Sequence, residues 1–386
     1  MIKRQLEKLL VEYSNKWPVV AVVGARQTGK TTLVKRVFPD YKYFNLEDPN
    51  EYQEVVSLLK NFDNNFSDGV FFDEIQRMPE LLSYIQASVD RTGKMGKIII
   101  SGSENLLLAS NISQSLAGRA IYLNMLPTSI QERMDSGFFD AELIQNIYKG
   151  GYPAIYNREL DATSYYEAYV QTYLQRDIQE LSEVGDLTSF RRFLILLADN
   201  IGSPLSINNI SKDSGLDRRK IEKWISILEA TYVIFRLPAY FDKLAKRVIK
   251  APKLYFYDTG LMSFLLGFKN AEDLMGSDKL GALFENFNIL EIYKNYKNSG
   301  LTNEFFFWQQ DKKEIDLLIS GRPNQKIIDF KLSSKYKDQF REGFIKYQSH
   351  ASSEFDVTSQ FIVYSGDTDE SHNPGLINWN DTDLIL

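Results

Sequence analysis

Residues 24–31 have the sequence Gly-Ala-Arg-Gln-Thr-Gly-Lys-Thr, which fits the phosphate-binding pattern G-x-x-x-x-G-K-T. Gly24 and Gly29 allow the backbone to curl so that successive N–H groups point at one phosphate. In this pattern Lys30 reaches the β- and γ-phosphates, and the Thr31 hydroxyl binds Mg²⁺. We therefore predict a nucleoside triphosphate site, rather than a glycine turn that only joins a strand to a helix. The predicted binding residues are Gly24, Ala25, Arg26, Gln27, Thr28, Gly29, Lys30, Thr31 and Thr32.

Two carboxylates, Asp73 and Glu74, directly follow the apolar residues 70–72. In a parallel sheet, the carboxyl end of such a strand lies at the same edge as the phosphate loop. We predict that Asp73 is an outer-sphere partner of Mg²⁺ and that Glu74 orients or deprotonates the attacking water. The alternative is an acidic strand end that faces solvent.

Three further side chains are candidates for the same reaction. Ser101 and Ser103 end another apolar strand, where a hydroxyl could sense the γ-phosphate; a helix N-cap before residues 106–108 explains them equally well. Arg119 could neutralise charge in the transition state as an arginine finger, within its own subunit or on a neighbouring one. A surface ion pair is the simpler explanation for any single arginine.

Carboxylates and a lysine also occur in two apolar segments near the C-terminus, residues 314–319 and 326–331. Alternate residues of a strand share a face, so Asp329 and Lys331 point the same way, and Asp316 could meet them across a hairpin. Two carboxylates can hold Mg²⁺, while a lysine orients the attacking water or stabilises the phosphorane. This D-(x)n-D-x-K arrangement is similar to that of restriction endonucleases. The similarity implies an additional acid on a helix, here Glu285.

Two features depart from that pattern. Ile315 stands where a proline often precedes the first aspartate, and the acid before Lys331 is Asp329 rather than the commoner glutamate. The alternative is a charged hairpin in which Asp329 and Lys331 only pair with each other. Because a solvated pair contributes only about 0 to 1 kcal/mol, stability gives little reason to place these charges between apolar residues. We expect a nuclease-like fold and leave cleavage itself open.

The elements that must position these residues follow from the hydrophobic pattern. Short apolar runs alternate with helical stretches in the first part of the chain, which predicts a parallel sheet covered by helices. A helix over residues 29–37 would aim its N-terminal dipole at the phosphate. A glycine turn at residues 150–153 then precedes an aromatic helical stretch, and the last part is expected to hold a helix followed by strands. The predicted strands of the first part are 19–23, 42–46, 70–73, 97–101 and 120–124.

Residues 206–215 and 217–230 have the spacing of a helix-turn-helix, with apolar residues at i, i+3, i+4 and i+7 in the second helix. Basic residues lie toward the start of that helix, where a recognition helix would meet DNA. Residues 236–253 add further basic residues interleaved with aromatic ones, as expected of a wing. The alternative is a protein-packing module with a solvated basic face. The basic residues are Arg218, Arg219, Lys220 and Lys223 in the helix, and Arg236, Lys243, Lys246, Arg247, Lys250 and Lys253 in the wing.

Length and composition limit these interpretations. The 386 residues suffice for about two to three domains. With 45 Lys and Arg against 51 Asp and Glu, any DNA contact must use local basic patches. The chain has no cysteine and only two histidines, which excludes disulfides, zinc fingers and cysteine nucleophiles. We find no signal peptide or membrane span and expect a cytoplasmic protein without a membrane partner. Residues 366–386 hold five acids and no Lys or Arg, which predicts a solvated acidic tail.

Together these motifs resemble the prokaryotic AAA+-type ATPases that carry a C-terminal domain of unknown function. The resemblance implies an α/β protein: a P-loop NTPase parallel sheet, then a helical/winged-helix domain and a small restriction-endonuclease-like α/β domain. The expected cofactors are ATP and Mg²⁺; DNA is a candidate partner, and the sequence is compatible with a homo-oligomer. Further segments that carry the resemblance are Leu46-Glu47-Asp48, Gly118-Arg119, Gly150-Gly151-Tyr152-Pro153, Arg176-Asp177-Ile178, residues 252–261 and Phe284-Glu285-Asn286.

The expected domains are an ATPase domain (1–145), a helical linker (146–189), a winged-helix-like domain (190–262) and a restriction-endonuclease-like domain with the acidic tail (263–386). We expect a Mg²⁺-dependent ATPase whose nucleotide state controls the DNA-facing winged helix and the nuclease-like module. The alternative is a nucleotide-gated regulatory or protein-binding ATPase whose nuclease-like domain is catalytically silent.

Overall fold

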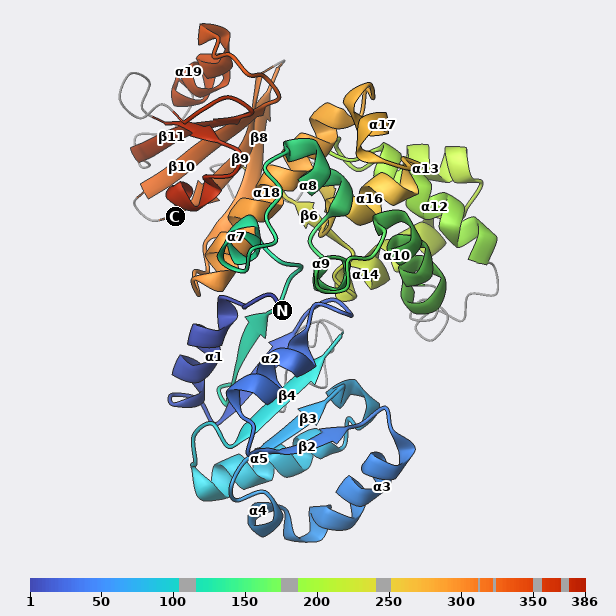
Figure 1. Ribbon diagram of the computed structural model, residues 1–386, viewed down its shortest axis with the longest axis vertical. Helices are drawn as coiled ribbons and strands as arrows, with labels where there is room; N and C mark the ends of the chain where they lie inside the picture. Colours follow the sequence, from blue (N-terminus) through green and yellow to red (C-terminus); the bar gives the residue numbers. More distant parts are fainter. Residues whose placement is uncertain are drawn as a thin grey trace.

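Figure 1 shows the computed structural model of the chain, which has a lower half formed by the first part of the sequence and a broader upper half. The N-terminus lies where the two halves meet. The structure describes residues 1–103, 116–174, 187–240, 251–311, 313–321, 324–349, 356–368 and 375–386.

The lower half is built around five parallel strands in the order β2-β3-β4-β1-β5. β1 and β4 are buried along their whole length, because helices cover both faces of the sheet. The predicted parallel sheet is confirmed, and each predicted strand is present to within one residue. The strands are β1 (Val19–Val23), β2 (Lys42–Asn45), β3 (Val70–Asp73), β4 (Ile98–Gly102) and β5 (Ala120–Asn124).

Alternate side chains of β1 enter two separate cores, one on each face of the sheet. Val20 and Val22 pack with two helices on one face, and Val19, Ala21 and Val23 pack with three helices on the other. This packing holds the end of β1, and hence the start of the phosphate loop, in one position. The first face carries α1 (Leu6–Ser14) and α2 (Lys30–Val37), and the second carries α3 (Pro49–Leu58), α4 (Phe62–Asn65) and α5 (Leu81–Thr92), with short 3₁₀ turns at Leu59–Asn61 and Ile75–Arg77.

The upper half contains a helical region that follows β5. Its N-terminal part packs around buried tyrosines, and its middle part packs around Trp224, which contacts Phe190 and Phe193. The helices are α7 (Ile130–Asp135), α8 (Leu143–Lys149), α9 (Pro153–Asn157), α10 (Ala162–Tyr169) with a π-helical turn at Val170–Leu174, α12 (Leu187–Asp199), α13 (Ile207–Ser214), α14 (Arg218–Ala230), α16 (Thr259–Leu265) and α17 (Ala271–Met275).

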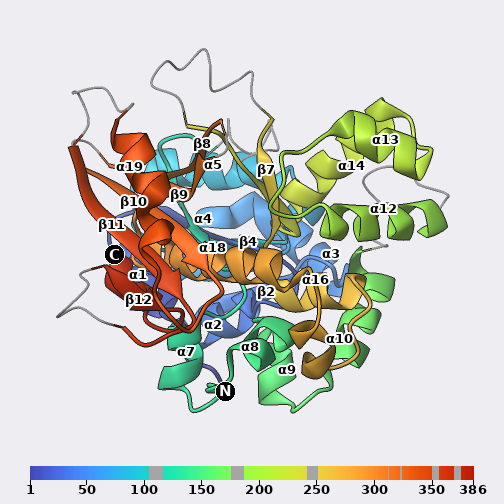
Figure 2. The ribbon, with the colours of Figure 1, turned by 90° about the horizontal axis from the view of Figure 1, so that it is seen from above.

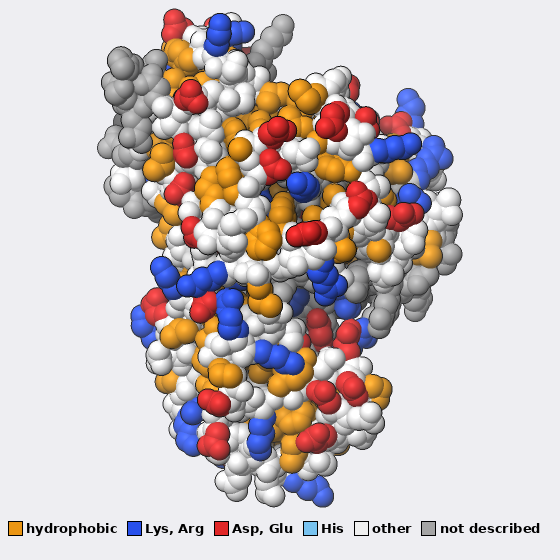
Figure 3. Space-filling view, in the orientation of Figure 1, with side chains coloured by type: hydrophobic (Ala, Val, Ile, Leu, Met, Phe, Trp, Pro, Cys, Tyr) orange, Lys and Arg blue, Asp and Glu red, His pale blue; other side chains and the backbone are white. Residues whose placement is uncertain are grey.

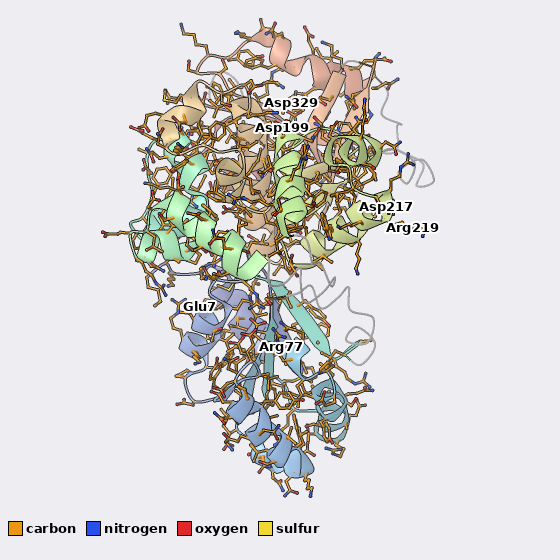
Figure 4. All side chains as sticks on the ribbon, turned by 90° about the vertical axis from the view of Figure 1, so that its right-hand side faces the viewer. Glu7, Arg77, Asp199, Asp217, Arg219 and Asp329 are labelled. Carbon is orange, nitrogen blue, oxygen red and sulfur yellow. The ribbon has the colours of Figure 1, made fainter. Side chains whose placement is uncertain are left out.

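The two helices predicted at 206–215 and 217–230 are confirmed as α13 and α14. Ser206 and Asp217 cap their N-termini, and Gly215 ends α13 with a positive φ of 74°. Two antiparallel strands, β6 (Ile234–Leu237) and β7 (Lys253–Phe256), follow them. Residues 241–250, which include most of the predicted wing, lie outside the described residues. Figure 4 shows Asp217 and Arg219 together at the outer side of the upper half.

The C-terminal region is a mixed five-stranded sheet in the order β12-β11-β10-β9-β8, in which only the pairs β10–β11 and β11–β12 are parallel. The long helix α18 (Leu280–Asn298) packs on one face, and α19 (Glu342–Gln348) packs on the other. Figure 2 shows this sheet and the helices α12, α13 and α14 on opposite sides of α18 and α16. The strands are β8 (Glu304–Gln310), β9 (Lys313–Ser320), β10 (Asn324–Lys331), β11 (Asp356–Tyr364) and β12 (Leu376–Asn378), and 3₁₀ turns occupy Asp338–Arg341 and Thr382–Ile385.

The predicted solvated tail is wrong for the part of residues 366–386 that the structure describes. β12 extends the sheet by pairing with β11, and Trp379 and Ile385 are buried. Trp379 packs against Phe287 of α18 and against Phe139. The acidic composition predicted a solvated tail. However, the apolar residues among the acids form the edge strand β12 and the buried side chains that hold it in place.

Candidate functional site

The phosphate loop has the geometry that its glycines predict. Gly24 has a φ of 152°, and a Cβ there would lie 2.1 Å from the carbonyl oxygen of Met125. Met125 is held at that place because its N–H donates to Val23. Gly29 has a φ of 95° and is the N-cap of α2. The loop can therefore present backbone N–H groups to an anion only with glycine at both positions.

Lys30 lies inside the loop and is 5% exposed. Its ammonium donates to the carbonyl oxygens of Gly24 and Ala25, both at 2.9 Å. Thr28 also donates to Ala25, at 2.9 Å, which closes the turn. The ammonium is thus placed within the curl of the loop, where a phosphate would approach.

Asp73 joins the loop to the rest of the sheet edge. Its carboxylate accepts hydrogen bonds from Thr31 at 2.6 Å, from Tyr43 at 3.2 Å and from Ser101. Burial, and then the charge of Asp73, raise the pKa of Tyr43 above its ordinary value, so the phenol stays a donor. Thr31 and Asp73 offer the oxygen ligands that Mg²⁺ prefers, and the donor set fits this ion.

Glu74 follows in the left-handed conformation, with a φ of 57°, which is uncommon for a residue with a side chain. Its carboxylate accepts from the Gln76 side chain at 2.6 Å and from the Ser103 N–H at 3.1 Å. Burial raises the pKa of Glu74, but the charge of Lys30 and the hydrogen bond from Gln76 outweigh it, so the net shift is downward. Glu74 is therefore an ionised group beside the loop.

The two serines and the arginine occupy different places. Ser101 lies beside Asp73, and Ser103 receives a hydrogen bond from Gln76 at 3.2 Å, so both serines are near the loop. Residues 106–108, on which the alternative helix cap depends, lie outside the described residues. Arg119 instead lies next to Val19 at the opposite edge of the sheet, one strand length of roughly 16 Å away. It forms an ion pair with Asp90, with Nε–Oδ1 at 2.7 Å.

A cleft of about 910 Å³ opens in front of the loop, and the helical region forms its other wall. Arg26, Gln27 and Thr32 line it from the loop side, and Arg158 lines it from the end of α9. Figure 3 shows Lys and Arg side chains along the surface where the two halves meet. The positive charge suits a polyanionic ligand.

Two residues outside the predicted set bond the loop, one from α10 and one from the segment before α1. The Tyr165 hydroxyl of α10 donates to the Gln27 side chain at 2.7 Å, and Gln27 itself has a φ of 62°. The guanidinium of the buried Arg4 donates to the Thr28 carbonyl at 2.7 Å and pairs with Glu132 at 3.0 Å. The aromatic run around Tyr165 is visible in the sequence, whereas nothing there indicates that Arg4 reaches the loop.

A buried polar joint connects the lower half to the upper half just after β5. Thr128 donates from both its N–H and its hydroxyl to the Gly151 carbonyl, at 2.7 Å. Lys294 of α18 donates to the Thr128 carbonyl at 3.1 Å, and Glu291 accepts from the Ile130 N–H at 2.7 Å. Because these groups are buried and satisfied, the joint holds α18 in a defined position relative to the sheet.

The joint continues through the buried Asp258. This carboxylate accepts from the Gly151 N–H at 2.7 Å, from the Tyr166 hydroxyl at 2.6 Å and from the Leu261 N–H at 2.9 Å, which caps α16. Tyr166 is the neighbour of Tyr165, and their rings pack edge to face at 5.1 Å. A contact at the phosphate loop is therefore linked to α16 by directly touching residues.

The C-terminal acids and lysine lie where the β9–β10 ladder opens. Pairing runs to Ile328–Leu317; beyond that point the Asp316 N–H donates to Asp329 at 3.2 Å, and the Phe330 N–H donates to Asp316 at 2.9 Å. Lys331 Nζ lies 3.4 Å from Asp329 Oδ2 and 3.8 Å from Asp316 Oδ2. Asp316, Asp329 and Lys331 are thus brought together as expected, inside the upper half, where Figure 4 labels Asp329.

Glu285 does not join the two aspartates in a three-carboxylate group. Its carboxylate accepts from Tyr255 and pairs with Lys253 at 3.4 Å. Within the described ranges, no three His, Cys, Asp or Glu side chains lie close enough together to hold a metal ion. Burial, and then the like charge of Asp316, raise the pKa values of Glu285 and Asp329 above their ordinary values.

The expected basic surface is only partly present. Arg218, Arg219 and Lys223 are exposed on α14, and Lys220 lies over the Trp224 ring at 4.7 Å. Two of the wing residues differ from expectation, since Arg236 forms an ion pair with Glu229 and Lys253 is 2% exposed. Lys253 is buried because it begins β7, where its ammonium meets the C-terminal acids. The sequence could have indicated this burial, because Lys253 directly precedes the apolar run Leu-Tyr-Phe.

Comparison with known proteins extends this description. Residues 16–134 match the family model of an AAA domain, and residues 140–272 and 280–380 match models of two domains of unknown function, DUF8612 and DUF4143. An uncharacterized protein of Mycobacterium tuberculosis is 28% identical over 314 residues, which cover 79% of this chain and 69% of that protein. Another, from Methanocaldococcus jannaschii, is 26% identical over 378 residues, which cover 88% and 80%.

Among solved structures, a Walker-type ATPase of Pyrococcus abyssi matches with a TM-score of 0.43 and 16% sequence identity, over 69% of this chain and 96% of that one. Within the described ranges, no helix combines the length and hydropathy needed to cross a lipid bilayer. Residues 16–134 are thus similar to an AAA domain, and the two regions that follow are similar to domains of unknown function.

Proposed function

We propose that the protein binds and hydrolyses MgATP at the phosphate loop. The observation that carries this proposal is the arrangement at the sheet edge, where Asp73 holds Thr31 while Glu74 lies beside Lys30. Lys30 and the loop N–H groups would bind the β- and γ-phosphates, and Thr31 and Asp73 would hold Mg²⁺ directly and through water. The ion would neutralise the charge that develops on the phosphates.

Within this proposal Glu74 orients the attacking water or removes its proton, and Ser101 or Ser103 senses the γ-phosphate. The test is MgATP turnover by the full chain compared with Lys30→Ala and Glu74→Gln. We expect a loss of roughly 10²-fold or more in kcat for Glu74→Gln and a loss of similar size for Lys30→Ala. Equal turnover in all three proteins would reject the proposal.

We further propose that nucleotide state is passed to the helical region, which contacts DNA in the manner of a winged helix. The support is the chain of contacts from Gln27 through Tyr165 to Asp258, together with the exposed Arg218 and Arg219 on α14. The net charge of −6 makes such binding a local effect.

Duplex DNA binding measured at several salt concentrations tests this part. Charge reversal at Arg218 and Arg219 is expected to weaken binding and to make it less dependent on salt, by about one unit of logarithmic slope per phosphate contact. Reversal at Arg91, which is on the lower half and already paired with Asp63, is the matched control. Identical salt slopes for both variants would leave a protein-binding ATPase as the better explanation.

Arg119 is a candidate arginine finger for a neighbouring subunit only, because in this fold it lies far from its own phosphate loop.

A second candidate function belongs to the C-terminal sheet. The opening of the β9–β10 ladder at Asp316 and Asp329, with Lys331 beside them, favours a nuclease-like site with one divalent cation. Mg²⁺ is often held by one or two carboxylates with substrate phosphate and water completing its coordination, so the pair fits. Metal-dependent DNA cleavage that disappears in both Asp329→Ala and Lys331→Ala would support activity, and its absence in wild type would support a silent module.

A further inference from the structure

Lys253 is the least expected residue of the C-terminal cluster. It comes from β7, in the two-stranded sheet that follows α14, yet its side chain is 3% exposed and its ammonium lies among acids from other elements. The ammonium is 3.4 Å from Glu285 of α18 and 3.4 Å from Glu314 of β9. The ring of Phe307 lies 5.5 Å away on another side. Lys253 is therefore enclosed by two carboxylates and an aromatic face.

Such an enclosed lysine needs a physical reason. Removing an ammonium from water costs several kcal/mol, and only well-placed opposite charges offset that cost. The largely buried Glu285 meets the same cost and lies near the charge of Asp316, whereas the Glu314 side chain is 41% exposed and is partly solvated. The ammonium and the carboxylates thus neutralise each other's charge. A divalent ion does the same when it binds between carboxylates.

We propose that Lys253 is a built-in cation that occupies the place of a divalent ion between Glu285 and Glu314. The cluster is thereby divided into two parts. Glu285 and Glu314 are neutralised from within the chain, and Asp316 and Asp329, with Lys331, form the part that is left for an external cation. For that second part alone, the inference rests on the nuclease-like site proposed above.

Charge bookkeeping agrees with this division. With all four carboxylates ionised, as when a cation is bound, four carboxylates and two lysines give the cluster a formal charge of −2, which a single divalent ion balances. Two divalent ions would leave an excess of positive charge beside the buried ammonium. The ion pair of Glu285 with Lys253 also agrees with the finding that, in the described residues, Glu285, Asp316 and Asp329 do not form one metal-binding group.

The test counts Mn²⁺ ions bound to the full-length protein without nucleotide, from the loss of the free Mn²⁺ electron paramagnetic resonance signal. Lys253→Met keeps most of the length of the side chain and removes its charge. We expect Lys253→Met to bind one Mn²⁺ more than wild type, and Lys253→Arg to bind the same number as wild type. The double variant Lys253→Met/Glu285→Gln should lose the gain. Equal counts for wild type and Lys253→Met would overturn the proposal.

Removal of the lysine could also prevent folding, because it leaves the acids unpaired. In that case, Mn²⁺ added during refolding should restore the native circular dichroism of Lys253→Met but not of Lys253→Met/Glu285→Gln. Failure of Mn²⁺ to restore the first variant would count against the proposal.

A final pair of variants needs no change at Lys253. Glu285→Gln in the wild-type background should leave the Mn²⁺ count unchanged, whereas Asp329→Asn should lower it by one. A loss in Glu285→Gln would overturn the role of Lys253 and leave the nuclease-like site standing. An unchanged count in Asp329→Asn would contradict the nuclease-like site, while the gain in Lys253→Met would still decide the role of Lys253.

Discussion

At the scale of single residues, Asp73 organises much of the candidate nucleotide site. It receives hydrogen bonds from side chains of three elements, namely Thr31 of α2, Tyr43 of β2 and Ser101 of β4. A buried carboxylate with several donors keeps each donor oriented, and removing it leaves those donors unpaired at a cost of about 1 to 3 kcal/mol each. The oxygen atoms that would hold Mg²⁺ in the proposed site are thus already assembled around one side chain.

Glu74 carries the first prediction, which concerns pH. Its pKa in the folded protein is below the ordinary value of 4.5, so its ionisation contributes stability that is fully present above that value and is lost as the pH falls through the lower, folded pKa. We expect Glu74→Gln to lower the free energy of unfolding relative to wild type at neutral pH, by an amount that shrinks under acid conditions. Urea unfolding of both proteins at neutral and acid pH measures this difference. A difference that grows with acidity would show that the pKa is raised instead.

At the scale of elements, the sequence predicted the helices and strands better than the contacts between distant segments of the chain. All five strands of the lower sheet and the helices α13 and α14 were predicted, because β-strand burial and helix capping are local patterns. The pairing of Tyr165 with Gln27 and the burial of Lys253 were not predicted. Both depend on how distant segments pack, and no periodicity along the chain encodes that.

Tyr165 gives the second prediction. Tyr165→Phe keeps the ring among its tyrosine neighbours but removes the hydroxyl that bonds Gln27. The loss of one hydrogen bond of about 0.5 to 1.5 kcal/mol predicts roughly a 2- to 10-fold change in KM or kcat for MgATP. Tyr169→Phe is the matched control, because the bond between the Tyr152 and Tyr169 hydroxyls lies in the same cluster. Equal kinetic effects of both variants would assign Tyr165 to general packing.

The third prediction concerns α19, which lies close to the C-terminal acids. A Cβ at Gly343 would lie 2.4 Å from the Glu314 carbonyl oxygen, so Gly343→Ala must displace the helix or the strand, at a cost of about 1 to 3 kcal/mol. Gly281 in α18 has open space around it, and Gly281→Ala should instead stabilise the protein by about 0.5 to 1 kcal/mol. Thermal unfolding of the two variants should therefore shift in opposite directions. Shifts of the same sign would contradict this packing of α19.

At the scale of the whole molecule, the two halves are joined by buried polar contacts rather than by a flexible connection. Lys294 and Glu291 of one long helix bond the segment that leaves β5, while Asp258 bonds the Gly151 turn. The N-terminal Arg4 adds a third connection, through Glu132. A change at the phosphate loop therefore has fixed contacts through which it can act on the upper half.

The fourth prediction tests the C-terminal segment as part of this whole. Deletion of residues 366–386 removes β12, Trp379 and Ile385, and the loss of each buried apolar anchor should cost about 2 to 5 kcal/mol. We expect poor solubility and a large loss of thermal stability. Leu384→Ala, at a residue that is 50% exposed, should stay within about 0.5 kcal/mol of wild type. A truncated protein as stable as the full chain would show that the edge strand is dispensable.

The position of Lys253 has a consequence for how such a protein can change over generations. The acids of the C-terminal sheet and the ammonium that balances them come from opposite sides of the expected boundary between residues 262 and 263. A recombination event at that boundary would bring in a foreign C-terminal half whose acids lack their counter-charge. The two regions are thus expected to be inherited together, and any successful chimera should have its crossover before β7.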